Sequence, residues 1–235
     1  MSLTGHPGGE PTRVGTSVGD ITAGLFTTIG ICSALYHRQN SGKGQKIDVG
    51  MLDSQVAILE NAIARYSATG EIPGPLGARH PSIVPFAAFH TSNGHIIIAA
   101  GNDSLFHRLS EALNCPEMAK DERYLSNALR ADHVDALKDE LEAVLTSNTT
   151  EHWLEVIQNA GVPCGAINNV AQVMADPQVL ARNMVVTTED PDAGTIRFSG
   201  NPIKMSSFAD PDTRGPVPRL DEHRSSILSD LKKTT

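Results

Sequence analysis

A single long helix that is apolar on most of its faces constrains this chain more than any other feature. Gly19 and Asp20 stand where the helix should begin, and the turn-forming run Ser41–Gly44 should end it after Asn40. Because a helix that is apolar all round must be covered on every side, we expect it to be buried inside a larger structure. An isolated chain would expose those faces, so we expect an oligomer that buries them. The apolar positions are Ile21, Leu25, Phe26, Ile29, Ile31 and Leu35.

The apolar stretch between residues 21 and 35 is interrupted by Thr, Gly and Ser, and we expect it to fall short of a membrane-spanning helix. The first residues, MSLTGHPGGEP, lack the basic and apolar regions of a secretory signal. The three cysteines, Cys32, Cys115 and Cys164, are widely spaced and form no C-x-x-C motif, which is typical of a reducing compartment. These features predict a soluble, cytoplasmic protein that does not associate with membranes.

The charge balance disfavours nucleic-acid binding. The 235 residues include 19 Lys and Arg against 27 Asp and Glu, a net charge of −8, and no basic stripe interrupts the acidic balance. A hydrophobic fraction of 40% suits a globular chain that can bury a sizeable core. His90 and His95 flank a predicted turn without the further ligands of a zinc site, so no metal is expected.

The remaining pattern mixes helices with two hairpins. Asn93-Gly94 between two β-rich runs predicts a hairpin over 85–100, and a second is expected around 190–194 between strands at 184–188 and 195–199. The segment Glu71–Pro85 holds four prolines and is the predicted linker. A strand is also expected at 45–49, followed by a helix that begins at an Asp53 N-cap and ends at Gly70. Further helices are expected at 104–113, at 128–145, at 150–160, where Asn148 and Glu151 mark the start, and at 170–175. A short turn of helix should begin at 177, the tail over 210–218 should be extended, and a short helix should follow 219.

Two side chains before the long helix are candidates for chemistry. Ser17 lies in a literal G-x-S-x-G, the pattern of a serine hydrolase, but that motif needs a preceding strand and residues 8–11 make a poor one. Asp20 lies in the first turn, where the macrodipole and free N–H groups favour an ionised carboxylate. Such a carboxylate can attack an activated acyl carbon, although most aspartates at this position only cap the helix. Local physics therefore leaves both roles of Asp20 open.

Residues 2–54 and the later blocks RHPSIVPFAAFHTSNGHIIIAAGNDSLFHRL, GVPCGAINN and DPQVLARNMV resemble the class III CoA-transferases, the CaiB/BaiF group that includes formyl-CoA transferase. The matching blocks occur in order over nearly the whole chain. In that family the aspartate of a G-D-x-x-x-G segment is the nucleophile, and this segment corresponds to Asp20 followed by Gly24. The resemblance thus implies that Asp20 is catalytic.

The resemblance also implies a reaction, the transfer of coenzyme A from an acyl-CoA to a free carboxylic acid through an aspartyl anhydride and an aspartyl-CoA thioester. Coenzyme A and acyl-CoA are then substrates, and no cofactor is bound permanently. The family's glycine-rich loop, whose N–H groups would stabilise oxyanions, falls at Gly74 and Gly77, and this sequence has only these two glycines there. Arg79, with His80 beside it, could bind an acceptor carboxylate, and a solvated linker is the alternative for both.

The fold that the resemblance implies is α/β. Residues 1–75 and 176–235 would form part of a Rossmann-like large domain, with a smaller α+β domain inserted over 76–175. Family members form an interlocked homodimer, and the linker suits such threading. They also carry a substantial region before the catalytic aspartate, so we expect this chain alone to have little activity unless another chain supplies that region.

Two alternatives remain open beside the transferase. An acyl-CoA racemase of the same family would need a Glu where this sequence has Asn102, and an amide has no proton to exchange; Asp103 is displaced by one position. An inactive remnant is the other alternative. The blocks look closest to the branch that handles dicarboxylic acids. Near the end of the chain, Asp221 stands where the family has glycine.

Overall fold

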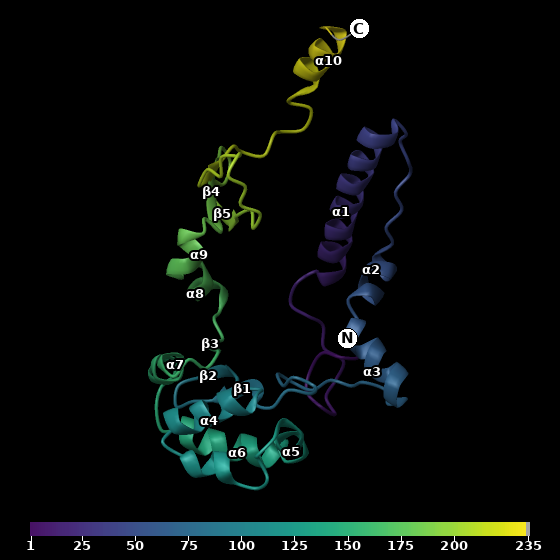
Figure 1. Ribbon diagram of the computed structural model, residues 1–235. Coiled ribbons are helices and arrows are strands. Elements are labelled where there is room, and N and C mark those ends of the chain that lie inside the picture. The colour runs from purple at the N-terminus through teal and green to yellow at the C-terminus, as the bar shows by residue number, and fades with distance from the viewer. Residues whose placement is uncertain (234–235) are drawn as a thin grey trace. The chain divides into compact units, whose positions relative to one another are not determined.

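The chain folds into both helices and short strands, so the expected mixed α/β class is confirmed (Figure 1). The structure is a computed structural model and describes residues 1–233. It divides into two compact units, Met1–Ala166 and a second unit from Ile167 onward. The helices are α1 (Val18–Ser41), α2 (Met51–Ala57), α3 (Glu60–Thr69), α4 (Asp103–Ala112), the 3-10 helix η1 (Pro116–Lys120), α5 (Asn127–Asp132), α6 (Val134–Leu145), α7 (Thr150–Asn159), α8 (Val170–Ala175), α9 (Pro177–Ala181) and α10 (Arg224–Lys233). The strands are β1 (Phe86–His90), β2 (His95–Ala99), β3 (Cys164–Ala166), β4 (Val185–Asp190), β5 (Gly194–Ser199) and β6 (Thr213–Arg214).

The long apolar helix is α1, and it lies where the sequence predicts it. Asp20 is in its first turn. The helix ends because Gly42 adopts a left-handed conformation (φ +72°) and donates its N–H to the carbonyl of Arg38 at 2.8 Å.

No residue of α1 is buried within this chain. Leu25 and Ile29 are 59% and 61% exposed, so the apolar faces are uncovered, as expected for an isolated chain. The expectation that this segment falls short of a membrane span is wrong, because α1 has 24 residues and an 18-residue window with mean hydropathy 1.5. Core helices of soluble proteins reach the same length and hydropathy. The length and hydropathy of α1 therefore show only that its apolar faces need to be buried against something.

The segment after α1 corrects a second expectation. The predicted strand at 45–49 is absent, since residues 43–50 form no regular secondary structure and no strand within residues 1–233 pairs with them. A strand needs a neighbour to receive its backbone hydrogen bonds. The segment runs back beside α1 instead, and Cγ2 of Ile47 lies 3.1 Å from the place of a Cβ on Gly30 (Figure 1).

The helix expected from Asp53 to Gly70 is two helices, α2 and α3. The N-cap of α2 is Gly50, and Asp53 lies in the first turn of the helix. The Asp53 carboxylate occupies the space beside Gly50 that a side chain would fill, since a Cβ on Gly50 would stand 2.8 Å from Oδ2 of Asp53. The helices separate at residues 58–59, where no Pro or Gly signals a break. Gly70 ends α3 in the left-handed conformation, as predicted.

The first unit has its core between helices and the antiparallel sheet β1-β2-β3. The hairpin β1-β2 turns at residues 91–94, as Asn93-Gly94 predicts. The strand β3 was not expected; it pairs with β2 through Cys164–Ala166. The helix α6 packs on β1, and α7 packs on β2 and β3. The largest fully buried apolar side chains are Phe89, Ile96, Ile98, Phe106, Leu109, Tyr124, Leu137, Leu141, Leu145, Ile157 and Val162, and Trp153 is almost fully buried beside them.

Two helix starts in this unit differ from expectation. The helix predicted over 128–145 is broken at His133 into α5 and α6. The N-cap of α7 is Thr149, whose hydroxyl accepts the N–H of His152 at 3.3 Å, in place of the expected Asn148. The carbonyl of Asn148 accepts a hydrogen bond from Ser92 N–H at 3.0 Å and so joins the hairpin turn to α7.

The second unit holds the expected helices α8 and α9 and the expected hairpin β4-β5. The tail over 210–218 was expected to be extended only, but Thr213 and Arg214 form β6, which pairs in parallel with β4. Asp221, which stands where the family has glycine, has φ +67°, the left-handed region that glycine favours and that Asp tolerates. The Rossmann-like architecture, the domain boundaries and the interlocked dimer stay predictions.

Candidate active site

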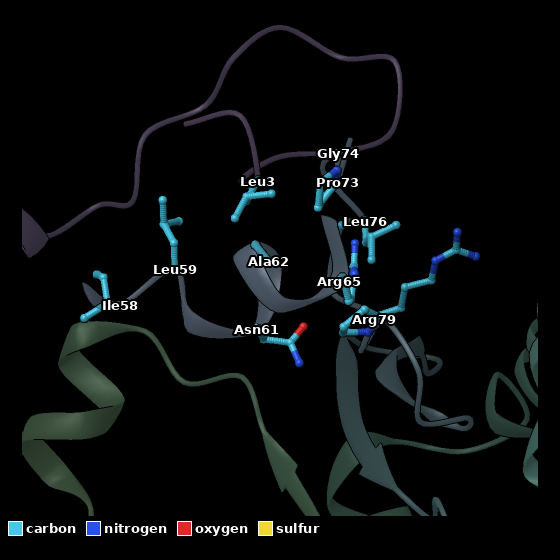
Figure 2. A pocket seen from close by; sticks show the side chains of 12 residues that line it. Leu3, Ile58, Leu59, Asn61, Ala62, Arg65, Pro73, Gly74, Leu76 and Arg79 are labelled. Atoms are coloured by element: carbon cyan, nitrogen blue, oxygen red, sulfur yellow. The ribbon is translucent and has the colours of Figure 1, made fainter. Parts of the chain in front are cut away.

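A pocket of about 220 Å³ opens in the first unit between the start of the chain, α3 and the linker (Figure 2). Its floor is one face of α3 and the turn before it, because Ile58, Asn61 and Arg65 follow one another at spacings of three and four, with Ala62 next to Asn61. The linker supplies the opposite wall. The lining residues are Leu3, Ile58, Leu59, Asn61, Ala62, Arg65, Pro73, Gly74, Leu76, Gly77, Arg79 and Pro81. The structure thus brings three of the predicted binding residues, Gly74, Gly77 and Arg79, to one pocket.

Gly77 has a backbone that only glycine adopts without strain. Its φ is +65°, and a Cβ there would stand 3.2 Å from Nδ1 of His6. Its N–H donates to the carbonyl of Gly5 at 2.8 Å. Gly77 therefore fastens the linker to the start of the chain and leaves its N–H unavailable to a substrate oxyanion in this conformation. A Cβ on Gly74 would meet no atom within 4 Å.

The two other predicted linker residues differ in their surroundings. Arg79 lines the pocket and forms an ion pair with Asp135, Nη1 to Oδ1 at 3.5 Å, with 37% of its side chain exposed. His80 is not among the lining residues. Its ring stacks on Phe86, and its Nδ1 accepts the N–H of Ile83 at 3.0 Å, so His80 shapes the turn that leads into β1.

Asp20 is exposed and lies outside the set of residues that line this pocket. The short helix α2 joins the two places. Nε2 of Gln55 stands 3.2 Å from the place of a Cβ on Gly19, next to Asp20, and Ile58 lines the pocket only three residues further along the chain. Three helical residues advance about 4.5 Å. The short helix α2 therefore contacts the first turn of α1 and leads directly into the pocket.

The other candidate residues are engaged elsewhere. Ser17 is the residue before α1, and residues 8–14 contain no strand, so the context of a serine hydrolase is missing there. Asn102 caps α4 by accepting the N–H of Leu105 at 2.8 Å, and Asp103 pairs with the buried Arg130 at 2.9 Å. Neither is placed as a free acid for proton exchange.

No metal centre is assigned. The rings of His90 and His95 lie 4.3 Å apart, and among residues 1–233 no three His, Cys, Asp or Glu side chains gather as a metal-binding group. Burial raises the pKa of the Cys164 thiol, and burial followed by the charge of Glu140 raises that of Cys115.

Sequence reasoning missed Arg65 and Asn61, which face the linker from α3. The available signal was their spacing of four, which places two polar groups on one face of a helix that carries Ala62 beside them. Arg65 and Asn61 line a pocket only because the linker folds back over α3. The periodicity of a helix does not predict which other segment will pack on it.

Comparison with known proteins extends the motif resemblance. A family model described as CoA-transferase family III matches residues 1–224. The chain is 42% identical over 232 residues to the acetyl-CoA:oxalate CoA-transferase of Acetobacter aceti, covering 98% of this chain and 58% of that protein. It is 38% identical over 237 residues to the succinate–glutarate CoA-transferase of Agrobacterium fabrum, covering 99% and 58%.

A crystal structure of a CaiB/BaiF family protein from Brucella suis has the same fold, with a TM-score of 0.79 and 39% identity over 98% of this chain and 60% of that chain. The chain therefore spans less than two thirds of the length of each of these proteins. The family model covers nearly all of the sequence, and the motifs around Asp20 lie inside it. This chain belongs to CoA-transferase family III.

Proposed function

We propose that the protein moves coenzyme A from an acyl-CoA thioester to a free carboxylic acid, with Asp20 as the nucleophile. The observation that carries the proposal is the position of Asp20 in the first turn of α1 within the G-D-x-x-x-G segment of a family III chain. A carboxylate there is stabilised as an anion by the helix dipole, and its exposure leaves it open to an incoming thioester.

The proposed reaction exchanges one activated acyl group for another. The Asp20 carboxylate attacks the thioester carbonyl, the C–S bond breaks, and a mixed anhydride and the CoA thiolate form. The thiolate attacks the Asp20 carbonyl of the anhydride, which releases the donor acid and leaves an aspartyl-CoA thioester. The acceptor carboxylate then displaces the thiolate from Asp20, and the thiolate attacks the acceptor's carbonyl to give the new acyl-CoA and free Asp20. No step uses water, so the free energy of the thioester bond is retained in the new acyl-CoA.

We propose that the substrates are short dicarboxylic acids and their CoA esters. Oxalate, succinate and glutarate in the names of the two relatives are dicarboxylic acids. The pocket between α3 and the linker supports a small acid, because its volume of about 220 Å³ lies below the roughly 300–1,000 Å³ of sites for drug-sized ligands.

The proposal includes a homodimer in the cytoplasm. The exposed apolar faces of α1 need a cover, and a second copy of the chain would bury Ile21, Leu25 and Ile29. Such burial would also close the open side of the first helical turn. Water excluded from that turn would leave the anhydride to react with the thiolate.

Trapping the intermediate tests the proposal. The chain is mixed with succinyl-CoA, treated with hydroxylamine and digested, and the peptide that contains residue 20 is examined by mass spectrometry. A hydroxamate at Asp20 is expected in the parent chain and absent in Asp20→Asn. The matched control is Asp53→Asn, because Asp53 also lies in the first turn of a helix.

The trapping experiment, together with an incubation in deuterated water, separates the alternatives. An inactive remnant leaves residue 20 unmodified with every acyl-CoA tried. A racemase exchanges the α-proton of a 2-methylacyl-CoA for deuterium without any acceptor acid and forms no hydroxamate. Either result contradicts the transferase proposal.

A further inference from the structure

The described side chains that line this pocket carry positive charge and no negative charge. Of these described side chains only Arg65 and Arg79 are charged, and none of them is Asp or Glu. Arg79 has a carboxylate partner in Asp135. Among the described side chains Arg65 has no carboxylate within 4 Å. A half-buried guanidinium without a nearby counter-charge suits the binding of an anion.

The position of Arg65 suits a ligand held between two elements. Arg65 rises from α3 one turn after Asn61, and Figure 2 shows it between that helix and the linker residues Gly74 and Leu76. The guanidinium is planar and presents paired N–H donors, which match the two oxygens of a carboxylate. Asn61 adds an amide that can donate to the same anion.

The rest of the pocket suits a short carbon chain. Leu3, Leu59 and Leu76 line it beside Arg65, so most of the wall is apolar and its charged groups are cationic. At about 220 Å³ it accommodates a small acid more readily than the nucleotide part of coenzyme A. The shape and charge favour a molecule with a few methylene groups and a terminal carboxylate.

We infer that Arg65 binds the non-reacting carboxylate of a dicarboxylic acceptor whose other carboxylate reacts at Asp20. The inference rests on the proposed function. The connection through α2 supports it, because Gln55 touches the turn that carries Asp20 and Ile58 lines the pocket. Arg65 is then the residue that distinguishes a dicarboxylic acid from a monocarboxylic acid of the same length.

The test compares succinate with butyrate, which have four carbons each and differ by one carboxylate. Binding of each acid to the 235-residue chain is measured by saturation-transfer NMR, and CoA transfer to each acid is measured by chromatography of the acyl-CoA products. The variants are Arg65→Gln and Arg65→Lys. Arg108→Gln is the control, because Arg108 is an exposed arginine on α4 outside the pocket.

Arg65→Gln should weaken succinate binding and raise KM for succinate on the order of tenfold to a hundredfold, because a charge-assisted hydrogen bond is lost. Butyrate binding and kcat with butyrate should stay within about twofold, since they do not use that bond. Arg65→Lys should lie between, because it keeps the charge and loses the paired donors. Arg108→Gln should match the parent chain.

Two results overturn the inference. One is an unchanged preference for succinate over butyrate in Arg65→Gln. The other is a loss of coenzyme A binding in that variant with succinate binding intact, which would assign Arg65 to a phosphate. A parent chain that gives neither the hydroxamate at Asp20 nor any transfer product overturns the proposed function instead, and the NMR comparison still decides the role of Arg65.

Discussion

The guanidinium of Arg130 is fully buried and donates from Nη2 to Oδ1 of Asp103 at 2.9 Å, while 58% of the Asp103 side chain stays exposed. Arg130 also donates to the carbonyls of Val84 at 2.8 Å and Tyr124 at 2.9 Å, and its guanidinium lies over the Phe106 ring. One side chain thus joins the end of the linker to α4 and to the loop before α5.

Arg130→Met should destabilise the first unit by about 3 kcal/mol or more, because two buried carbonyls lose their donors. Asp103→Asn should have a smaller effect, since an amide oxygen can still accept the bond near solvent. Urea unfolding followed by fluorescence checks this, because Trp153, the only tryptophan, lies in the same core. Arg108→Met is the control, and an equal loss in that variant would contradict the explanation.

Gly77→Ala should loosen the linker. The left-handed conformation costs a residue with a Cβ roughly 1–2 kcal/mol, and the new Cβ would press on His6. Hydrogen exchange of residue 77 and its neighbours should accelerate. Gly74→Ala, at a site with open space around the Cβ, should exchange like the parent chain; similar acceleration in both would show that the conformation at residue 77 is not the cause.

The alkylation rate of Cys32, which lies on α1, should show whether a second copy of the chain buries that helix. The Cys32 side chain is exposed in the single chain, whereas burial raises the pKa of the Cys115 and Cys164 thiols and slows their alkylation. In a dilute monomer iodoacetamide should modify Cys32 first. In the proposed homodimer the modification should slow as protein concentration rises, and unchanged reactivity in a dimeric sample would place the dimer contact elsewhere.

The second unit should lose stability in acid through Asp210. Hydrogen bonds from Lys204 and then Arg214 lower the pKa of Asp210 to about 2, below its ordinary value of 3.8. A depressed pKa in the folded state gives stability that is complete above 3.8 and is lost as the pH falls from 3.8 to about 2. The NMR signals of β4 and β6 should follow this range, and Asp210→Asn should remove that part of the pH dependence.

Local signals account for the parts of the fold that the sequence predicts correctly. The apolar period and Gly42 define α1, and Asn93-Gly94 defines the first hairpin. The wrong or missing elements depend on partners. The strands β3 and β6 have three and two residues, too few to show a period, and each exists only through pairing with a strand that is distant in sequence or already formed.

The candidate site divides in the same way. Asp20 and the linker glycines were identified through family motifs, because those motifs are contiguous in the chain. Arg65 was not identified, since its environment arises where the linker crosses α3 and includes Leu3 from the beginning of the chain. Sequence periodicity describes one helix at a time and does not predict tertiary contacts between distant segments.

The participation of Leu3 in the pocket wall has a practical consequence for producing the protein. A purification tag joined before Met1 would place foreign residues three positions from Leu3, which lines the pocket, and five positions from Gly5, whose carbonyl accepts the hydrogen bond from Gly77. Assays of acid selectivity should therefore use a tag that is attached after Thr235, or one that is removed.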